Sequence, residues 1–127
     1  MSKITADEYQ RLSLRTESHN STLESFATFG SNHRLLHGAI GIATESGELL
    51  DAIKKHVWYG KPLDGANIEE EIGDVCWYLA LLCSARGISL STVMEMNIAK
   101  LRVRYPEKFT EEAALQRDLD AERKVLE

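Results

Sequence analysis

The chain has 127 residues, of which 43% are hydrophobic and 28% are charged, and its formal net charge is −5. That length and apolar content suit one folded domain over residues 1–127, and the negative charge argues against a general nucleic-acid-binding protein, which would usually carry a basic face. The sequence contains no secretory signal and no apolar run long enough to span a membrane, so we expect no membrane partner and a cytoplasmic location.

Apolar residues recur at helical spacing along the chain, and strand alternation is hard to find. The first helix is expected to begin near Thr5, which forms a capping-box pattern with Glu8, and to end at about Arg15–His19. A less regular connection over residues 20–30 follows. The second helix, capped by Ser31 or Asn32, is expected to run to about Val57.

A loop rich in turn residues, 58–65, separates the second and third helices. Asn67 is expected to cap the third helix, and Arg86–Gly87 to end it. Cys76 and Cys83 lie two turns apart on it, roughly 10 Å along the axis, which is too far for a disulfide. An apolar seam with 4-3-4-3 spacing predicts packing against other helices and consists of Ile68, Ile72, Val75, Leu79 and Leu82.

The fourth helix is expected to begin at Ser89 or Ser91 and to end before Pro106. A final, mostly charged helix is expected after Thr110. The whole pattern predicts an all-α fold with a four-helix-bundle core, at about residues 31–109, and an additional C-terminal helix.

Two short acidic motifs, Glu45–Glu48 and Glu71–Asp74, lie inside the second and third helices. Residues three apart share a helix face, so each motif presents two carboxylates in one direction, and four converge if the helices pair. Burying four unpaired negative charges is very costly, and a divalent cation is the usual resolution. Carboxylate oxygens favour Mg²⁺, Mn²⁺ or Ca²⁺, so the motifs predict a metal site.

Glycines accompany the acidic motifs, with Gly38, Gly41 and Gly47 in the second helix and Gly73 in the third. Each costs about 1 kcal/mol relative to alanine inside a helix. We therefore expect close backbone approach, which would matter at Gly47 and Gly73 because they lie between the paired acids.

The chain also carries basic residues that suit the binding of phosphate oxygens. Lys100 and Arg104 share a helix face with Asn97 on roughly the same side, and Lys54 follows the first acidic motif. Metal ions bound by the carboxylates would attract phosphate oxygens and lower the pKa of a bound water, while basic residues gripped the outer phosphates. This is the logic of metal-assisted phosphoanhydride hydrolysis, although each basic residue also fits an ordinary solvated charge.

The segments Gly41–Asp51, Glu70–Val75 and Asn97–Pro106 together resemble the MazG-like all-α nucleoside triphosphate pyrophosphohydrolases, over about His33–Phe109. The resemblance implies Mg²⁺-dependent cleavage, with Mn²⁺ as a substitute ion, between the α and β phosphates of a nucleotide substrate. The products would be a nucleoside monophosphate and pyrophosphate, in nucleotide-pool housekeeping. The resemblance also implies a homodimer or homotetramer.

The resemblance assigns roles residue by residue. The metal ligands would be Glu45, Glu48, Glu71 and Asp74. Apart from the resemblance, the attacking water needs a base, for which we expect Glu48, and we expect Glu48 and Glu71 to be the catalytic residues. Many relatives carry a further acid where this chain has Thr44. The residues expected to bind substrate are Lys54, Tyr78, Asn97, Lys100 and Arg104.

Two alternative functions stay open, a phosphoribosyl-ATP pyrophosphohydrolase-like enzyme and a non-catalytic, metal-binding helical regulatory oligomer. His33 and His37 are spaced for zinc but lack a third ligand nearby, and His37 also steps by helical spacing toward Glu45, which suits a nucleotide contact. Trp58 and Tyr59 suit base stacking, packing or a dimer contact, whereas Trp77 suits the core or an interface.

Overall fold

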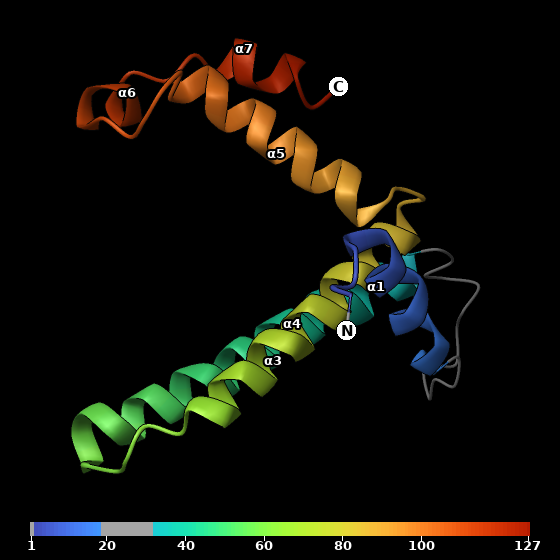
Figure 1. Cartoon of the computed structure of the whole chain (residues 1–127), viewed down its shortest axis with the longest axis vertical. Coiled ribbons are helices and arrows are strands. Elements are labelled where there is room, and N and C mark those ends of the chain that lie inside the picture. The colour runs from blue at the N-terminus through green and yellow to red at the C-terminus, as the bar shows by residue number, and fades with distance from the viewer. Residues whose placement is uncertain (1, 19–31) are drawn as a thin grey trace. The chain divides into compact units, whose positions relative to one another are not determined.

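The computed structural model of the chain describes residues 2–18 and 32–127. Over these residues all regular structure is helical and no strand occurs, which confirms the all-α prediction (Figure 1). The expected connection over residues 20–30, and Ser31 as a cap, lie outside the described residues. The helices are α1 (Ala6–Ser13), the 3₁₀ helix η1 (Leu14–Thr16), α3 (Asn32–Tyr59), α4 (Gly65–Ala85), α5 (Leu90–Arg104), α6 (Glu111–Leu115) and α7 (Leu119–Lys124).

The chain forms two compact units, Met1–Ile88 and Ser89–Glu127. The expectation of one domain over residues 1–127 stays a prediction, and each unit is described by itself. No single helix of the described segments is both long enough and apolar enough to cross a membrane.

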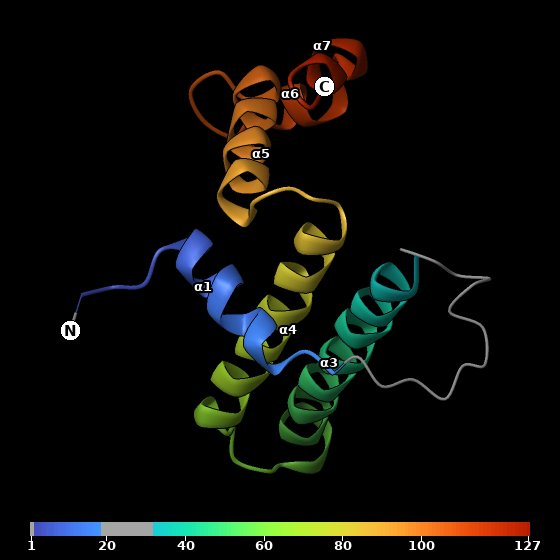
Figure 2. The same ribbon diagram turned by 90° about the vertical axis from the view of Figure 1, so that its right-hand side faces the viewer.

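The first unit is built on the hairpin of α3 and α4, which lie side by side along their length, while α1 packs against α4 (Figures 1 and 2). Two glycines of α3 let the helices approach closely. A Cβ atom on Gly38 would lie 2.7 Å from Cδ2 of Leu82, and one on Gly41 would overlap the ring of Tyr78. Helix packing therefore requires these two positions to lack a side chain.

The expectation of close approach at Gly47 and Gly73 was wrong for the described residues. A Cβ atom at either position would meet nothing within 4 Å in this part of the chain. The close contacts of α3 with α4 lie instead at Gly38, against the side chain of Leu82, and at Gly41, against the ring of Tyr78.

The start of α4 also differs from the prediction, because Asp64 and not Asn67 is the N-cap residue. The Asp64 side chain accepts a hydrogen bond from the backbone N–H of Asn67 at 3.1 Å. An N-cap aspartate satisfies one of the free N–H groups of the first turn. Asn67 consequently lies inside the helix, where its own side chain is available for other contacts.

The apolar seam predicted for α4 is only partly covered. Its members Ile72 and Leu79 are 53% and 39% exposed, and the other three are half-buried. The fully buried residues of α4, Ala80 and Leu81, lie outside the predicted seam. A two-helix hairpin can cover only one stripe of each helix, so other apolar positions face outward. Both cysteines are free, as expected, with Cys83 buried and Cys76 half-buried.

The N-terminal segment is fastened to α4 by hydrogen bonds. The predicted capping box between Thr5 and Glu8 begins α1, which continues into η1. The indole N–H of Trp77 donates to the Ser13 carbonyl and to the Thr16 hydroxyl, both at 2.9 Å. These bonds hold Thr16 beside the middle of α4.

In the second unit, Ser89 caps α5, which ends at Arg104 before Pro106 as expected. The region after Thr110 is helical as predicted, in two short helices, because Asp118 caps a new helix by accepting from the N–H of Ala121 at 2.9 Å. Helix α7 packs against α5, and its Glu122 pairs with Arg104.

Candidate metal centre

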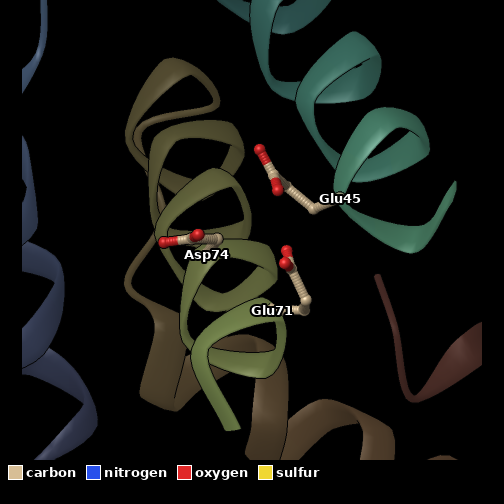
Figure 3. A group of neighbouring side chains, drawn as sticks. All are labelled: Glu45, Glu71 and Asp74. Atoms are coloured by element: carbon tan, nitrogen blue, oxygen red, sulfur yellow. The ribbon is translucent and has the colours of Figure 1, made fainter. Parts of the chain in front are cut away.

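Three carboxylates meet where α3 and α4 pack together. Glu45 reaches from α3 toward Glu71 on α4, and Asp74 lies one turn further along α4 (Figure 3). Each residue offers an oxygen, and these atoms all lie within 4.8 Å of one another. Gly41 precedes Glu45 by about one turn, so its close contact with Tyr78 brings the two helices together next to the carboxylates.

Glu71 is the buried member of this cluster, with 4% of its surface exposed. One carboxylate oxygen, Oε1, accepts a hydrogen bond from the side-chain amide of Asn67 at 3.0 Å. The other, Oε2, is buried and has no hydrogen-bond partner within the described segments. Because an unpartnered buried carboxylate oxygen is costly, its presence beside two further carboxylates fits a hard cation with oxygen ligands.

Like-charge repulsion also marks the cluster. Burial, followed by the nearby carboxylates of Glu71, Glu48 and Asp74, raises the pKa of Glu45 above its ordinary value. The negative charge of Glu71 is the largest cause that raises the pKa of Glu48, with burial second. Each shift means that the charged form is disfavoured, and a cation at the cluster would relieve that cost.

Glu48 lies at the edge of the other three predicted ligands, close enough to Glu71 for the charge of Glu71 to raise its pKa. Its carboxylate is exposed and does not belong to the group of oxygens within 4.8 Å. It lines a neighbouring cavity together with Glu71. The structure thus brings together three of the four predicted carboxylates and places the fourth at their edge.

Two cavities border the cluster on the first unit. One, of about 580 Å³, is lined by Glu48, Glu71 and Asn67 and by two cations, Lys55 and Lys61. The other, of about 450 Å³, is lined by Glu45 and Asp74 together with Thr16, Ser18, His37, Trp77 and Tyr78. The carboxylates therefore separate a cavity that carries lysines from a cavity that carries aromatic rings.

The aromatic cavity contains Tyr78, one of the predicted substrate contacts. The Tyr78 ring meets His37 and Trp77 edge-on, with ring centroids 5.7 Å and 5.1 Å apart. Trp77, expected in the core or at an interface, is half-buried and lines this cavity. In residues 2–18 and 32–127, only carboxylates form a cluster of three or more metal-ligating side chains, so His33 and His37 gain no third zinc ligand there.

Two of the predicted basic residues, Lys54 and Arg104, have carboxylate partners. Lys54 lies 3.4 Å from Asp51, and Lys55 lies 2.6 Å from the same carboxylate. Asn97 and Lys100 lie on α5 in the second unit, Asn97 exposed and Lys100 half-buried. Their substrate-binding role, like that of Lys54, stays a prediction.

Arg104 is held by the C-terminal helix α7. Its Nε and Nη2 atoms each donate to the Glu122 carboxylate at 2.9 Å, and Arg117 donates to the same carboxylate at 2.6 Å. The two guanidinium groups hold the pKa of Glu122 well below its usual range. The Arg104 side chain thus already binds one carboxylate, and its contact with phosphate stays a prediction.

The sequence interpretation missed two residues of this region, Asn67 and Lys61. Asn67 precedes Glu71 by four residues, a spacing that allows a side-chain hydrogen bond on a helix, but the residue was assigned to the cap. Lys61 lies in the loop before α4, whose turn residues predict only a change of chain direction. A lysine in a short loop after an acidic helix carries no distinctive spacing, so no sequence signal identifies it.

Comparison with known proteins identifies the family to which this chain belongs. Residues 35–109, more than half of the chain, match the model of the MazG nucleotide pyrophosphohydrolase domain. The Gene 37 protein of Mycobacterium phage L5 is 32% identical over 77 residues, which are 55% of this chain and 65% of that protein. The chain thus spans just under two thirds of this relative's length. No solved structure matches the chain significantly.

Proposed function

Because this chain belongs to the MazG nucleotide pyrophosphohydrolase family, we propose that it hydrolyses nucleoside triphosphates to monophosphate and pyrophosphate with a divalent cation, Mg²⁺ or in its place Mn²⁺. One observation carries the proposal beyond family membership. Glu71 is buried with an unpartnered oxygen beside Glu45 and Asp74, an arrangement suited to a hard cation. The family match also favours this activity over that of a phosphoribosyl-ATP pyrophosphohydrolase.

The residues that would hold the cation are Glu45, Glu71 and Asp74, with Glu48 at the edge of the group. A bound divalent cation would polarise a phosphoryl oxygen and lower the pKa of a water. Without a bound cation the carboxylates repel an anionic phosphate, so phosphate binding beside them would depend on the cation.

Glu48 is the proposed proton acceptor. Its carboxylate is exposed to the cavity, and the charge of Glu71 raises its pKa, which makes it a stronger base. As a water oxygen bonds to the α phosphorus, Glu48 would take the water's proton and the bond from the α phosphorus to the bridging oxygen would break. Pyrophosphate would leave with that oxygen.

The two cavities suggest how the nucleotide is oriented. The cavity with Tyr78, Trp77 and His37 offers ring faces and edges to a base or sugar. The opposite cavity offers the ammonium groups of Lys55 and Lys61 to the phosphates. Lys54, Asn97, Lys100 and Arg104 stay proposed contacts of the pyrophosphate end.

We further propose that the enzyme is a homodimer or homotetramer. Large apolar side chains of α3 lie exposed, with Leu50 at 68% and Val57, two turns further on, at 58%, and with Ile40 at 53% nearer the start of the helix. An exposed apolar stripe of this kind along one helix is typical of a surface covered by a partner, and a second copy of the chain would present the same stripe. A cytoplasmic location, a housekeeping role and the absence of a nucleic-acid partner stay predictions.

Pyrophosphate release from a panel of nucleoside triphosphates and phosphoribosyl-ATP tests the proposal. With millimolar Mg²⁺ we expect release from at least one triphosphate, and with EDTA we expect none. A non-catalytic regulatory oligomer would bind Mn²⁺ and release no pyrophosphate from any member of the panel. Release that EDTA leaves unchanged would contradict the proposed metal dependence.

A further inference from the structure

Asn67 is the one amide that donates a hydrogen bond to the Glu71 carboxylate among the described residues. Its side-chain amide donates to Glu71 Oε1 at 3.0 Å, which leaves Oε2 without a donor. An ionised carboxylate can accept about four hydrogen bonds, so one donor leaves most of its acceptor capacity unused. Asn67 therefore fixes the carboxylate without satisfying it.

The position of Asn67 is itself well determined. Its backbone N–H is bound by the Asp64 side chain at 3.1 Å, in the first turn of α4. Asn67 and Glu71 are four residues apart on the same helix, and Asn67 lines the lysine-bearing cavity beside Glu71. A capped first turn thus anchors the amide that holds the buried carboxylate.

The chemistry of the donor matters as much as its place. An amide is neutral, so it orients a carboxylate and leaves the negative charge intact, whereas a lysine or arginine would cancel that charge. Glu45 and Asp74 add two more carboxylates within 4.8 Å. The group keeps the charge that a divalent cation requires.

We propose that Asn67 is a positioning residue, which holds the Glu71 carboxylate beside Glu45 and Asp74 and leaves Oε2 available to a divalent cation. The inference rests on the proposed metal-dependent function, which it deepens. Partners of this kind, which orient a ligand without touching the metal, typically change metal affinity by 10–100-fold when they are removed. Neither the acidic motifs nor the expected capping role of Asn67 assigns it this function.

Mn²⁺ binding to the full-length protein without nucleotide tests the inference, measured by calorimetry on the wild type and three variants. Asn67→Leu removes the donor at similar size and should weaken Mn²⁺ affinity about tenfold or more. Asn67→Gln keeps an amide within reach and should stay within about threefold of the wild type. Glu69→Gln changes an exposed residue of the same helix and should bind like the wild type.

Unfolding in EDTA separates positioning from simple support of the fold. Leucine is a better helix former than asparagine, so Asn67→Leu should unfold in EDTA at nearly the wild-type denaturant concentration. The inference would be overturned, with the proposed function intact, if Asn67→Leu lost stability in EDTA but bound Mn²⁺ with unchanged affinity. Equal weakening of Mn²⁺ binding by Asn67→Leu and Asn67→Gln would have the same consequence. A wild type that binds no Mn²⁺ would overturn the proposed function, and the inference with it.

Discussion

At the scale of single residues, Glu71 decides the chemistry of this site. It is the one buried carboxylate of the cluster, and it has an oxygen for which the described residues provide no donor. A surface carboxylate in the same place would be solvated and would need no cation. Burial thus distinguishes this residue from the other acids of the two motifs.

Glu71→Gln should cut turnover by at least ~10²-fold, the scale of losing one key electrostatic group. Glutamine nearly keeps the shape and removes the charge. Glu69→Gln, at an exposed position two residues earlier, is the matched control and should keep close to wild-type turnover. Steady-state rates with saturating Mg²⁺ measure both, and equal losses would place the site on the wrong face of α4.

The pKa shifts of Glu45 and Glu48 predict how stability depends on pH. Both pKa values are raised in the folded protein above the ordinary value of 4.5, so in the window above that value the folded state binds more protons than the unfolded chain. Stability in EDTA should therefore fall as pH rises through this window. The contribution of Glu122, whose pKa is lowered, is lost only as pH falls below 4.5 and does not interfere.

Melting curves in EDTA at about pH 5.5 and about pH 7.5 measure this dependence. The double variant Glu45→Gln, Glu48→Gln removes both titrating groups and serves as the reference. Relative to it, the wild type should lose melting temperature as the pH rises. The raised pKa values of Glu45 and Glu48 would be contradicted if the melting temperature of the wild type changed with pH as much as that of the double variant. They would also be contradicted if the wild type became more stable at the higher pH.

At the scale of elements, the packing of α3 on α4 sets the spacing of the carboxylates. Gly41 allows the ring of Tyr78 to press against α3 about one turn from Glu45. A Cβ atom there would overlap the Tyr78 ring, so the ring beside the cluster would have to move. The close contact that requires glycine at position 41 therefore also helps to hold the carboxylates of the site together.

Gly41→Ala should destabilise the protein by about 1–3 kcal/mol, the usual cost of overpacking a close contact. Gly73→Ala, in the middle of α4 with nothing within 4 Å of the added Cβ, should instead stabilise it by about 0.5–1 kcal/mol through helix propensity. Urea unfolding in EDTA measures both. Similar effects of the two substitutions would show that helix contact at Gly41 is unimportant.

The helices themselves were largely predictable from the sequence, because apolar periodicity and capping residues are local signals. Ser89 and the Thr5–Glu8 capping box were identified correctly. At α4 two good capping residues, Asp64 and Asn67, lie three apart, and propensity alone could not choose between them. In the structure Asp64 is the cap, because its side chain accepts from the backbone N–H of Asn67.

The acidic cluster was predictable in part. The spacing of the two motifs identified Glu45, Glu71 and Asp74 as residues that converge. Spacing could not show that Glu71 alone is buried, or that Glu48 lies at the edge, because both depend on how far α3 is rotated against α4. For the same reason, the sequence could not show that Gly38 and Gly41 are contact points and that Gly47 and Gly73 are not.

At the scale of the whole molecule, the exposed apolar stripe of α3 predicts self-association. Leu50→Glu places a charge in the centre of that stripe, where the side chain is 68% exposed in the single chain. It should shift the protein toward monomer in sedimentation velocity, whereas Gln116→Glu, which adds the same charge at an exposed position of the second unit, should not. A wild type that sediments as a monomer would remove the proposed oligomer.

The position of bond cleavage tests the central claim most directly. Hydrolysis of a triphosphate substrate in ¹⁸O-labelled water with Mg²⁺, followed by mass spectrometry of the products, should give a labelled nucleoside monophosphate and unlabelled pyrophosphate. That result follows if water attacks the α phosphorus at the carboxylate cluster and pyrophosphate leaves. A diphosphate with orthophosphate as primary products, or label that enters only the pyrophosphate, would contradict the account.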